Sequence, residues 1–206
     1  GVAGVTGSMA TMQRPVVDAN TITIDNGKLK LYVARHGRNL IDSLIMDGKK
    51  ICDGAHLVAT NTNATYASVV DSAVVERAGS SRALIKICGT MSDGSRRWLP
   101  FTLRLYAYAA NEQLRMVHSF IYDGDQDKDF ISSLGLTFDV PLRKETYNRH
   151  VMFAMDGGKM WHEPVQPLDG RSPLDRNYNW QERQQAGFEI PAANTFDERQ
   201  QTFLSE

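Results

Sequence analysis

Hydrophobic and polar residues alternate along most of the chain up to about residue 155. In residues 21–33, TITIDNGKLKLYV, every second residue is apolar on both sides of the pair Asn26-Gly27. An Asn-Gly pair between two such runs predicts a β-hairpin, because a type I′ turn needs positive φ at both of its central residues. The pattern therefore predicts two antiparallel strands with a tight turn at Asn26-Gly27.

The same alternation recurs further along the chain, with turn residues between the runs. Asp47-Gly48 predicts a second tight hairpin, and Gly79-Ser80-Ser81 and Asp93-Gly94 predict two further connections. Strands that recur about every 8–12 residues with turn residues between them are typical of an antiparallel sandwich or barrel. The sequence therefore predicts an all-β fold. The two tight hairpins supply the first expected strands. The remaining expected strands cover residues 72–78, 82–88, 98–109, 113–124, 133–142 and 149–155.

The character of the sequence changes after about Trp161. Residues 162–180 contain three prolines and few regularly spaced apolar residues, which is typical of an irregular loop or linker. Thr195 and Glu198 have the spacing of a capping box, which predicts a short helix near the end of the chain. We therefore predict an antiparallel β domain over residues 1–165, and a linker with the start of a following domain over residues 166–206.

Composition and charge restrict the partners. The 206 residues are 42% hydrophobic and 23% charged, and the formal net charge is −1, so no net positive charge favours nucleic acid or an anionic membrane. The chain has no apolar run of about 18 residues, and it has no P-loop, Gly-x-Gly-x-x-Gly or Gly-x-Ser-x-Gly motif. We expect no nucleic-acid partner, no membrane partner and no cofactor.

The two cysteines leave the redox state open. Cys52 and Cys88 are not part of a Cys-x-x-Cys motif and have no clustered histidines nearby, which disfavours a zinc site. They are expected to form either one disulfide or two buried free thiols.

An acidic stretch, FIYDGDQDKDF, resembles the opening of a calcium loop. It carries carboxylates at every second position: Asp123, Asp125, Asp127 and Asp129. An EF-hand loop also needs a glycine at its sixth position and a glutamate at its twelfth, and these positions hold Lys128 and Leu134. The stretch is therefore interpreted as an acidic connection between strands, with Asp123, Asp125 and Asp127 as the candidate ligands if a cation does bind.

Several long phrases carry a resemblance to a known family. DGSRRWLPFTLRLYAYA, HSFIYDGDQDKDFISSLGLTFDVPL and NRHVMFAMDGGKMWHEPVQPL resemble the N-terminal β region of the exo-rhamnogalacturonan lyase-like proteins. The resemblance covers most of residues 20–170. It implies a large secreted protein in which a RIFT-type barrel-like β domain comes first, a β sandwich second and a helical toroid third. The toroid carries most of the lyase chemistry, and this chain has no counterpart of it.

A lyase that removes a proton beside a uronate carboxylate must neutralise that carboxylate, supply a base and protonate the leaving oxygen. Tyr147, Arg149 and His150 offer these groups within four residues. On a strand, however, His150 would face away from the other two. The trio is therefore either an active centre on a bulged strand or a polar face of an edge strand.

Trp161, His162 and Glu163 are the candidate sugar-binding residues. An indole face packs on the apolar face of a sugar, while imidazole and carboxylate groups bond its hydroxyls. The alternative is that Trp161 seals an interdomain contact. Trp98 is expected to cap the β core, and His118 is expected to be a core or half-core residue.

Three hypotheses for function follow. The first is a non-catalytic β domain of a secreted or periplasmic pectin-degrading enzyme that packs on the downstream catalytic domain and lines its cleft. The second is a free-standing module that binds polysaccharide or oligosaccharide. The third is a lyase in its own right. Secretion is implied by the resemblance alone.

Overall fold

The computed structural model describes residues 11–62, 64–143 and 149–164, without the side chains of His150 and of residues 159–164. The chain divides into two compact units, Gly1–Pro141 and Leu142–Glu206, which are described separately. The predicted helix near residues 195–204 lies outside the described residues.

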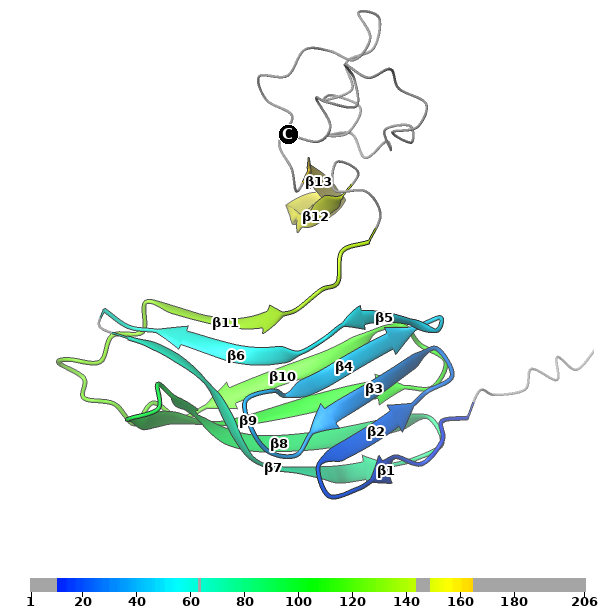
Figure 1. The fold of residues 1–206 in the computed structure, drawn as a ribbon, viewed down its shortest axis with the longest axis horizontal. Helices are drawn as coiled ribbons and strands as arrows, with labels where there is room; N and C mark the ends of the chain where they lie inside the picture. Colours follow the sequence, from blue (N-terminus) through cyan, green and yellow to red (C-terminus); the bar gives the residue numbers. More distant parts are fainter. Residues whose placement is uncertain (1–10, 63, 144–148, 165–206) are drawn as a thin grey trace, which may run out of the picture. The chain divides into compact units, whose positions relative to one another are not determined.

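In the first unit, eleven strands form one antiparallel sheet (Figure 1). They are β1 Val16–Val17, β2 Thr21–Asp25, β3 Leu29–Ala34, β4 Ile41–Met46, β5 Lys49–Cys52, β6 Ala55–Thr60, β7 Thr65–Ala78, β8 Arg82–Ser92, β9 Arg97–Tyr108, β10 Leu114–Phe120 and β11 Ser133–Phe138.

The sheet is curled but open. Hydrogen-bonded neighbours follow the order β1-β2-β3-β4-β6-β7-β8-β9-β10, with β5 added to β4 and β11 added to β6. A barrel requires the first and last strands of this path to pair, and β1 and β10 do not pair. Figure 1 shows β1 to β5 in one layer and β7 to β10 in the other. The all-β prediction is thus confirmed as a sandwich, and the barrel form is not adopted.

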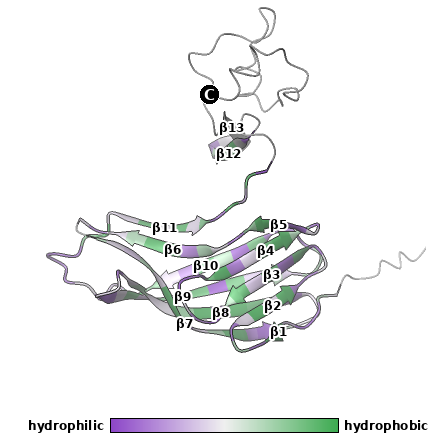
Figure 2. Ribbon diagram, in the orientation of Figure 1, coloured by the Kyte–Doolittle hydropathy of each residue, from purple (hydrophilic) through white to green (hydrophobic). Residues whose placement is uncertain are grey.

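The core lies between the two layers. Alternate residues of β2, β3 and β4 pack against alternate residues of β8 and β9, and Figure 2 shows the matching alternation of hydropathy along the strands. Ile22, Leu31, Ile85 and Leu103 are at most 1% exposed. Each such side chain contributes about 1.5–3 kcal/mol through burial. Trp98 is also 1% exposed, which confirms its predicted place in the core.

The first hairpin is formed as predicted, but its turn differs by one residue. Asn26 pairs with Leu29 through its backbone, so the central residues are Gly27 and Lys28. Gly27 has φ of +89°, and the backbone N–H of Leu29 closes the turn by donating to Oδ1 of Asn26 at 2.7 Å. Asn26 is instead buried, and its side-chain amide donates to the backbone oxygens of Tyr108 and Asn111, each at 2.8 Å.

The second hairpin has the predicted turn. Asp47 and Gly48 both have positive φ, 48° and 70°, as a type I′ turn requires. The connections at Gly79-Ser80-Ser81 and Asp93-Gly94 also lie between strands, β7 to β8 and β8 to β9.

The second unit contains a two-stranded antiparallel sheet, β12 His150–Met155 and β13 Lys159–Pro164, joined by the 3-10 turn Asp156–Gly158. β12 coincides with the predicted strand over 149–155. β13 was not predicted, because the sequence was interpreted as irregular from His162 onward, and His162 to Pro164 form the second half of this strand.

Two further findings concern the cysteines and the expectation that no segment crosses a membrane. Cys52 and Cys88 are both free, so the alternative of a disulfide is not realised; Cys52 is buried and Cys88 is half-buried. In the part of the chain that the structure describes, no helix has the length and apolarity needed to cross a bilayer.

Candidate functional site

The outward face of strands β7 to β10 carries a cluster of basic and aromatic residues. Along β8 and β9 the core residues alternate with half-exposed ones, so Lys86, Arg104 and Tyr106 point away from the core. The strand register places the outward residues in two adjacent rows. The first row contains Val74, Lys86, Arg104 and Val117, and the second contains Arg77, Leu84, Tyr106 and Arg115.

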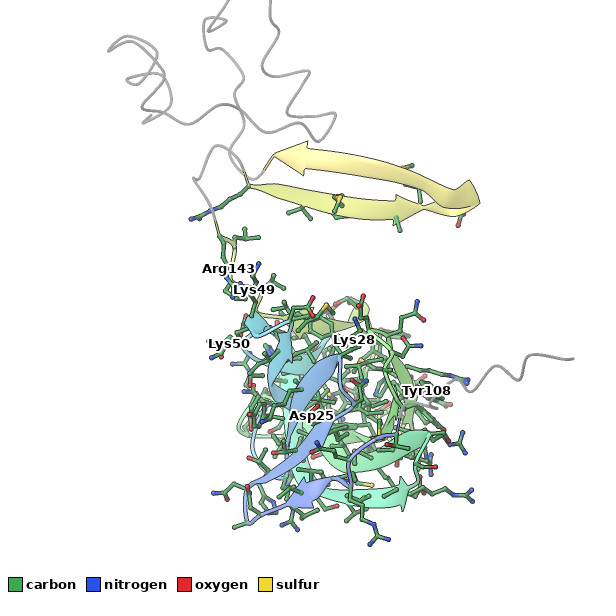
Figure 3. All side chains as sticks on the ribbon, turned by 90° about the vertical axis from the view of Figure 1, so that its right-hand side faces the viewer. Asp25, Lys28, Lys49, Lys50, Tyr108 and Arg143 are labelled. Carbon is green, nitrogen blue, oxygen red and sulfur yellow. The ribbon has the colours of Figure 1, made fainter. Side chains whose placement is uncertain are left out.

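We call Arg77, Lys86, Arg104, Tyr106 and Arg115 the basic–aromatic face. Arg115 lies over the ring of Tyr106, with 5.5 Å from its guanidinium carbon to the ring centroid, which is cation–π geometry. In the next row Arg82 pairs with Tyr108, which Figure 3 labels at the end of β9. In two successive rows, therefore, an arginine and a tyrosine are neighbours on adjacent strands.

One acidic residue, Glu76, lies within this basic surface. Its Oε2 accepts a hydrogen bond of 3.0 Å from Nε of Arg104. This bond lowers the pKa of Glu76, and the charges of Lys86 and Arg77 act in the same direction. The same bond raises the pKa of Arg104. Glu76 therefore stays ionised at neutral pH and holds the guanidinium of Arg104 in place.

The chemistry of the face suits an anionic, extended ligand. Arginine presents a planar set of N–H donors that matches a carboxylate. A tyrosine ring offers an apolar surface for the C–H face of a sugar, with a hydroxyl group to bond its oxygens. A row of these groups across several strands could contact successive units of a chain that carries carboxylates.

A second polar cluster lies where β6 meets β11. Nη2 of Arg38 donates to Nε2 of His56 over 2.8 Å, and His56 is 9% exposed. Burial lowers the pKa of His56 and the Arg38 charge lowers it further, while Asp139 opposes them. The backbone of Asp139 also bonds to Asp53 and Gly54. This cluster fastens the end of β11 to the sheet, and its histidine has little access to a ligand.

The acidic stretch is a structural loop. Asp129 is buried, and both of its oxygens accept hydrogen bonds from Arg96, each at 2.7 Å. Arg96 also lies over the ring of Trp98, 4.9 Å from its centroid. The hydroxyl group of Tyr122 donates to the backbone oxygen of Asp129 over 2.6 Å. The loop is thus tied to the edge of the core by an ion pair that sequence reasoning missed, because its partners are 33 residues apart.

Two of the three candidate metal ligands, Asp123 and Asp125, are engaged in the same loop. Asp123 accepts the N–H of Leu99 at 2.7 Å, which supports Leu99 in its left-handed conformation with φ of 49°. Asp125 accepts the N–H of Asp127 at 2.9 Å and pairs with Lys128. Among the described residues, no group of three or more His, Cys, Asp or Glu side chains is placed to hold a metal ion.

The candidate catalytic trio is only partly described. Tyr147 lies outside the described residues, Arg149 precedes β12, and His150 begins that strand, with its side chain outside the description. The proposed convergence of these three groups stays a prediction.

The candidate sugar-binding residues all belong to β13. Trp161, His162 and Glu163 pair with Phe153, Met152 and Val151 of β12. Their side chains lie outside the description, so this assignment also stays a prediction. His118, by contrast, is half-buried beside Phe101 and Phe120, as expected, and burial lowers its pKa.

Sequence reasoning did not identify the basic–aromatic face. The alternating phrase FTLRLYAYA contains Arg104 and Tyr106, but only its apolar positions were interpreted. Their polar neighbours could have been noted as one outward face of a strand. The residues contributed by β7, β8 and β10 become neighbours only through the strand register.

Comparisons with known proteins give one family and one relative. A family model described as "PcRGLX-like protein central beta sandwich domain" matches residues 16–206. "Uncharacterized protein YetA" from Bacillus subtilis (strain 168) is 32% identical over 177 residues. That alignment covers 79% of this chain and 20% of the relative, so the chain spans about a fifth of the length of this curated relative. The matched description is the central sandwich, rather than the N-terminal β region suggested by the sequence phrases, and it agrees with a sheet that does not close.

Proposed function

Because the chain belongs to the PcRGLX-like protein family, through its central β-sandwich domain, we propose that it is a non-catalytic domain of a secreted, polysaccharide-degrading protein. Its basic–aromatic face binds the acidic polysaccharide and forms one wall of the substrate cleft. The catalytic groups belong to another domain of the longer protein.

The observation that carries this proposal is the arrangement of Lys86, Arg104 and Arg115 around Tyr106 on one outward face. The chain has a formal net charge of only −1, so this local excess of positive charge is a property of the face and not of the whole chain. Pectic polysaccharides such as rhamnogalacturonan carry a uronate carboxylate in each repeat. Guanidinium groups spaced across neighbouring strands are suited to a ligand with repeated carboxylates.

Calorimetry with rhamnogalacturonan oligosaccharides tests the proposal. We expect saturable binding that weakens as salt is added, because the attraction is between exposed charges. Replacing Arg115 by Gln or Tyr106 by Ala should weaken binding roughly tenfold, as expected for loss of one charged or stacking contact. The carboxyl-reduced form of the same oligosaccharide should bind much more weakly.

A matched control exists on the other layer. Lys30 lies over the ring of Tyr32 on β3, 5.8 Å from the centroid, so it is also a cation–π pair on an outward strand face. The Lys30→Gln and Tyr32→Ala variants should bind the oligosaccharide like the unmodified chain. Equal losses in both sets of variants, or no heat from the unmodified chain, would remove the proposed role of the basic–aromatic face.

The two alternatives give different results. A free-standing binding module would bind as tightly alone as within the longer protein, whereas a cleft wall gains affinity from the rest of the cleft. A lyase, with Tyr147, Arg149 and His150 as base, neutraliser and acid, would produce the ultraviolet absorbance of an unsaturated uronate from this chain alone. We expect no such absorbance.

A further inference from the structure

The apolar face of the core extends onto two of the edge strands, β10 and β11. On β11, Leu134 and Phe138 pair with Ala59 and Ala55, which are core residues of β6. On β10, Phe120 pairs with the core residue Phe101 of β9. Each edge strand therefore continues the inward face by one further row of apolar side chains.

These side chains are exposed. Phe120 is 42% exposed, Leu134 37% and Phe138 43%, and in the connecting loop Ile121 is 67% and Phe130 60% exposed. We call these five residues the open edge. Among the described residues of the first unit, seven of the ten exposed large hydrophobic side chains lie between residues 120 and 140. A concentration of this kind is unusual on a free protein surface and marks an interaction site.

The backbone at this place is also unpaired on one side. Among the strands that the structure describes, β10 pairs with β9 alone, and β11 pairs with β6 alone. Natural sheets protect such edges with charges, bulges or a covering segment, because an exposed apolar edge strand associates with other chains. Here Phe120 on β10 and Leu134 and Phe138 on β11 carry no charge, so a covering partner is the protection that fits this part of the edge.

The charges beside the open edge indicate what kind of partner fits. Exposed Asp123, Asp125 and Asp127 lie in the loop that joins β10 to β11, with Lys128 paired to Asp125. In a symmetric dimer the same patch meets itself, so two acidic loops would approach each other. A surface with apolar side chains and a basic rim avoids this repulsion.

We infer that the open edge is the docking surface for another domain of the longer protein, one that presents apolar side chains with basic residues around them. The inference rests on the proposed function in one respect, namely that this chain is one domain of a larger protein. The relative from Bacillus subtilis is long enough to contain such a further domain, because the aligned region makes up only 20% of that relative.

Cysteine labelling compares the accessibility of the open edge in this chain with its accessibility in the longer protein. Phe138→Cys and Phe120→Cys are prepared in this chain and in the longer protein that contains it, without polysaccharide, and the rate of reaction with a charged thiol reagent is measured. Val17→Cys on β1, 51% exposed at the other end of the strand order, is the matched control, and the unmodified chain gives the background from Cys52 and Cys88. We expect at least tenfold slower labelling at residues 120 and 138 in the longer protein, and an unchanged rate at residue 17.

Three results would overturn the inference. Equal rates at residues 120 and 138 in both contexts would show that nothing covers the open edge. Equal slowing at residue 17 would show general shielding rather than a docking surface. Concentration-dependent protection in this chain alone, together with a dimer in sedimentation, would assign the surface to a second copy. Because no sugar is present, these results are independent of whether the basic–aromatic face binds polysaccharide.

Discussion

Asp129 fixes the acidic loop through three hydrogen bonds to its carboxylate. Two come from the guanidinium of Arg96, each at 2.7 Å, and the third comes from the backbone N–H of Asp125 at 2.8 Å. These bonds, with those from Arg96 as the main cause, lower the pKa of Asp129 from 3.8 to about 2. Because the loop follows β10 and precedes β11, this one side chain helps to position both edge strands.

The Asp129→Asn variant should therefore be less stable, and its stability should depend on pH differently. A pKa lowered in the native state means that the ionised carboxylate stabilises the fold above its ordinary pKa of 3.8, and that this contribution disappears as the pH falls toward about 2. We expect the variant's Tm to be several degrees below that of the unmodified chain at neutral pH, with the gap closing between pH 3.8 and about 2. Thermal melts followed by circular dichroism across this pH range measure the difference in Tm between the variant and the unmodified chain.

Asp127→Asn is the control for this experiment, because Asp127 is exposed in the same loop. Its Tm should remain close to that of the unmodified chain at every pH. An Asp129→Asn variant with an unchanged Tm at neutral pH would mean that Arg96 does not stabilise the loop.

Among the elements, β8 contains a bulge that depends on a glycine. The register between β8 and β9 shifts between Gly89 and Met91, and Gly89 is buried. A methyl group added there would collide with the backbone oxygen of Val69 and with the ring of Phe101. Val69 belongs to β7 and Phe101 to β9, so both strands beside β8 lie too close to residue 89 to leave room for a side chain.

Gly89→Ala should destabilise the fold by about 1–3 kcal/mol, the usual cost of inserting a methyl group into a packed interior. Gly135→Ala on β11 is the matched control, because a methyl group there meets no atom within 4 Å. Urea denaturation of the two variants measures the free energy of unfolding. A Gly89→Ala variant as stable as the control would show that β7 and β9 move apart at small cost.

The sequence allowed most strands to be predicted, since alternation and turn residues are local signals. β6 was missed because its inward residues include Ala55 and Ala59, which are weak signals of a buried strand face. Alternation also cannot distinguish a sandwich from a barrel, because inward and outward residues alternate in both. Closure depends on whether distant strands pair, which the local pattern does not encode.

The candidate site was harder to predict than the strands for the same reason. Lys86, Arg104 and Arg115 belong to three strands, and each of them alone is an ordinary surface residue. They form one face only because β8, β9 and β10 pair in a particular register. The predicted residues Trp161 to Glu163 were instead chosen from a single short segment, which is the kind of site that a sequence makes visible.

For the whole molecule, the position of the buried core bears on where the domain ends. The cluster of buried core residues extends from Met12 to Ala107, and the last partly buried side chain that packs against it is Leu136. The division into compact units falls just after this, at Pro141. The sequence instead placed the limit at residue 165, and the family match extends to residue 206. The physical question is which residues the first unit needs in order to fold.

Two shortened chains answer it, one ending after residue 141 and one after residue 165. Because every member of the core cluster precedes residue 141, both chains should unfold cooperatively, with Tm values within a few degrees of that of the full chain. Thermal melts followed by circular dichroism and by the fluorescence of buried Trp98 make the comparison, provided that Trp161 is replaced by Phe in the two longer chains and Trp180 is replaced by Phe in the full chain. If the chain ending at residue 141 fails to fold while the one ending at 165 succeeds, β12 and β13 belong to the cooperative unit and the predicted limit is the better one.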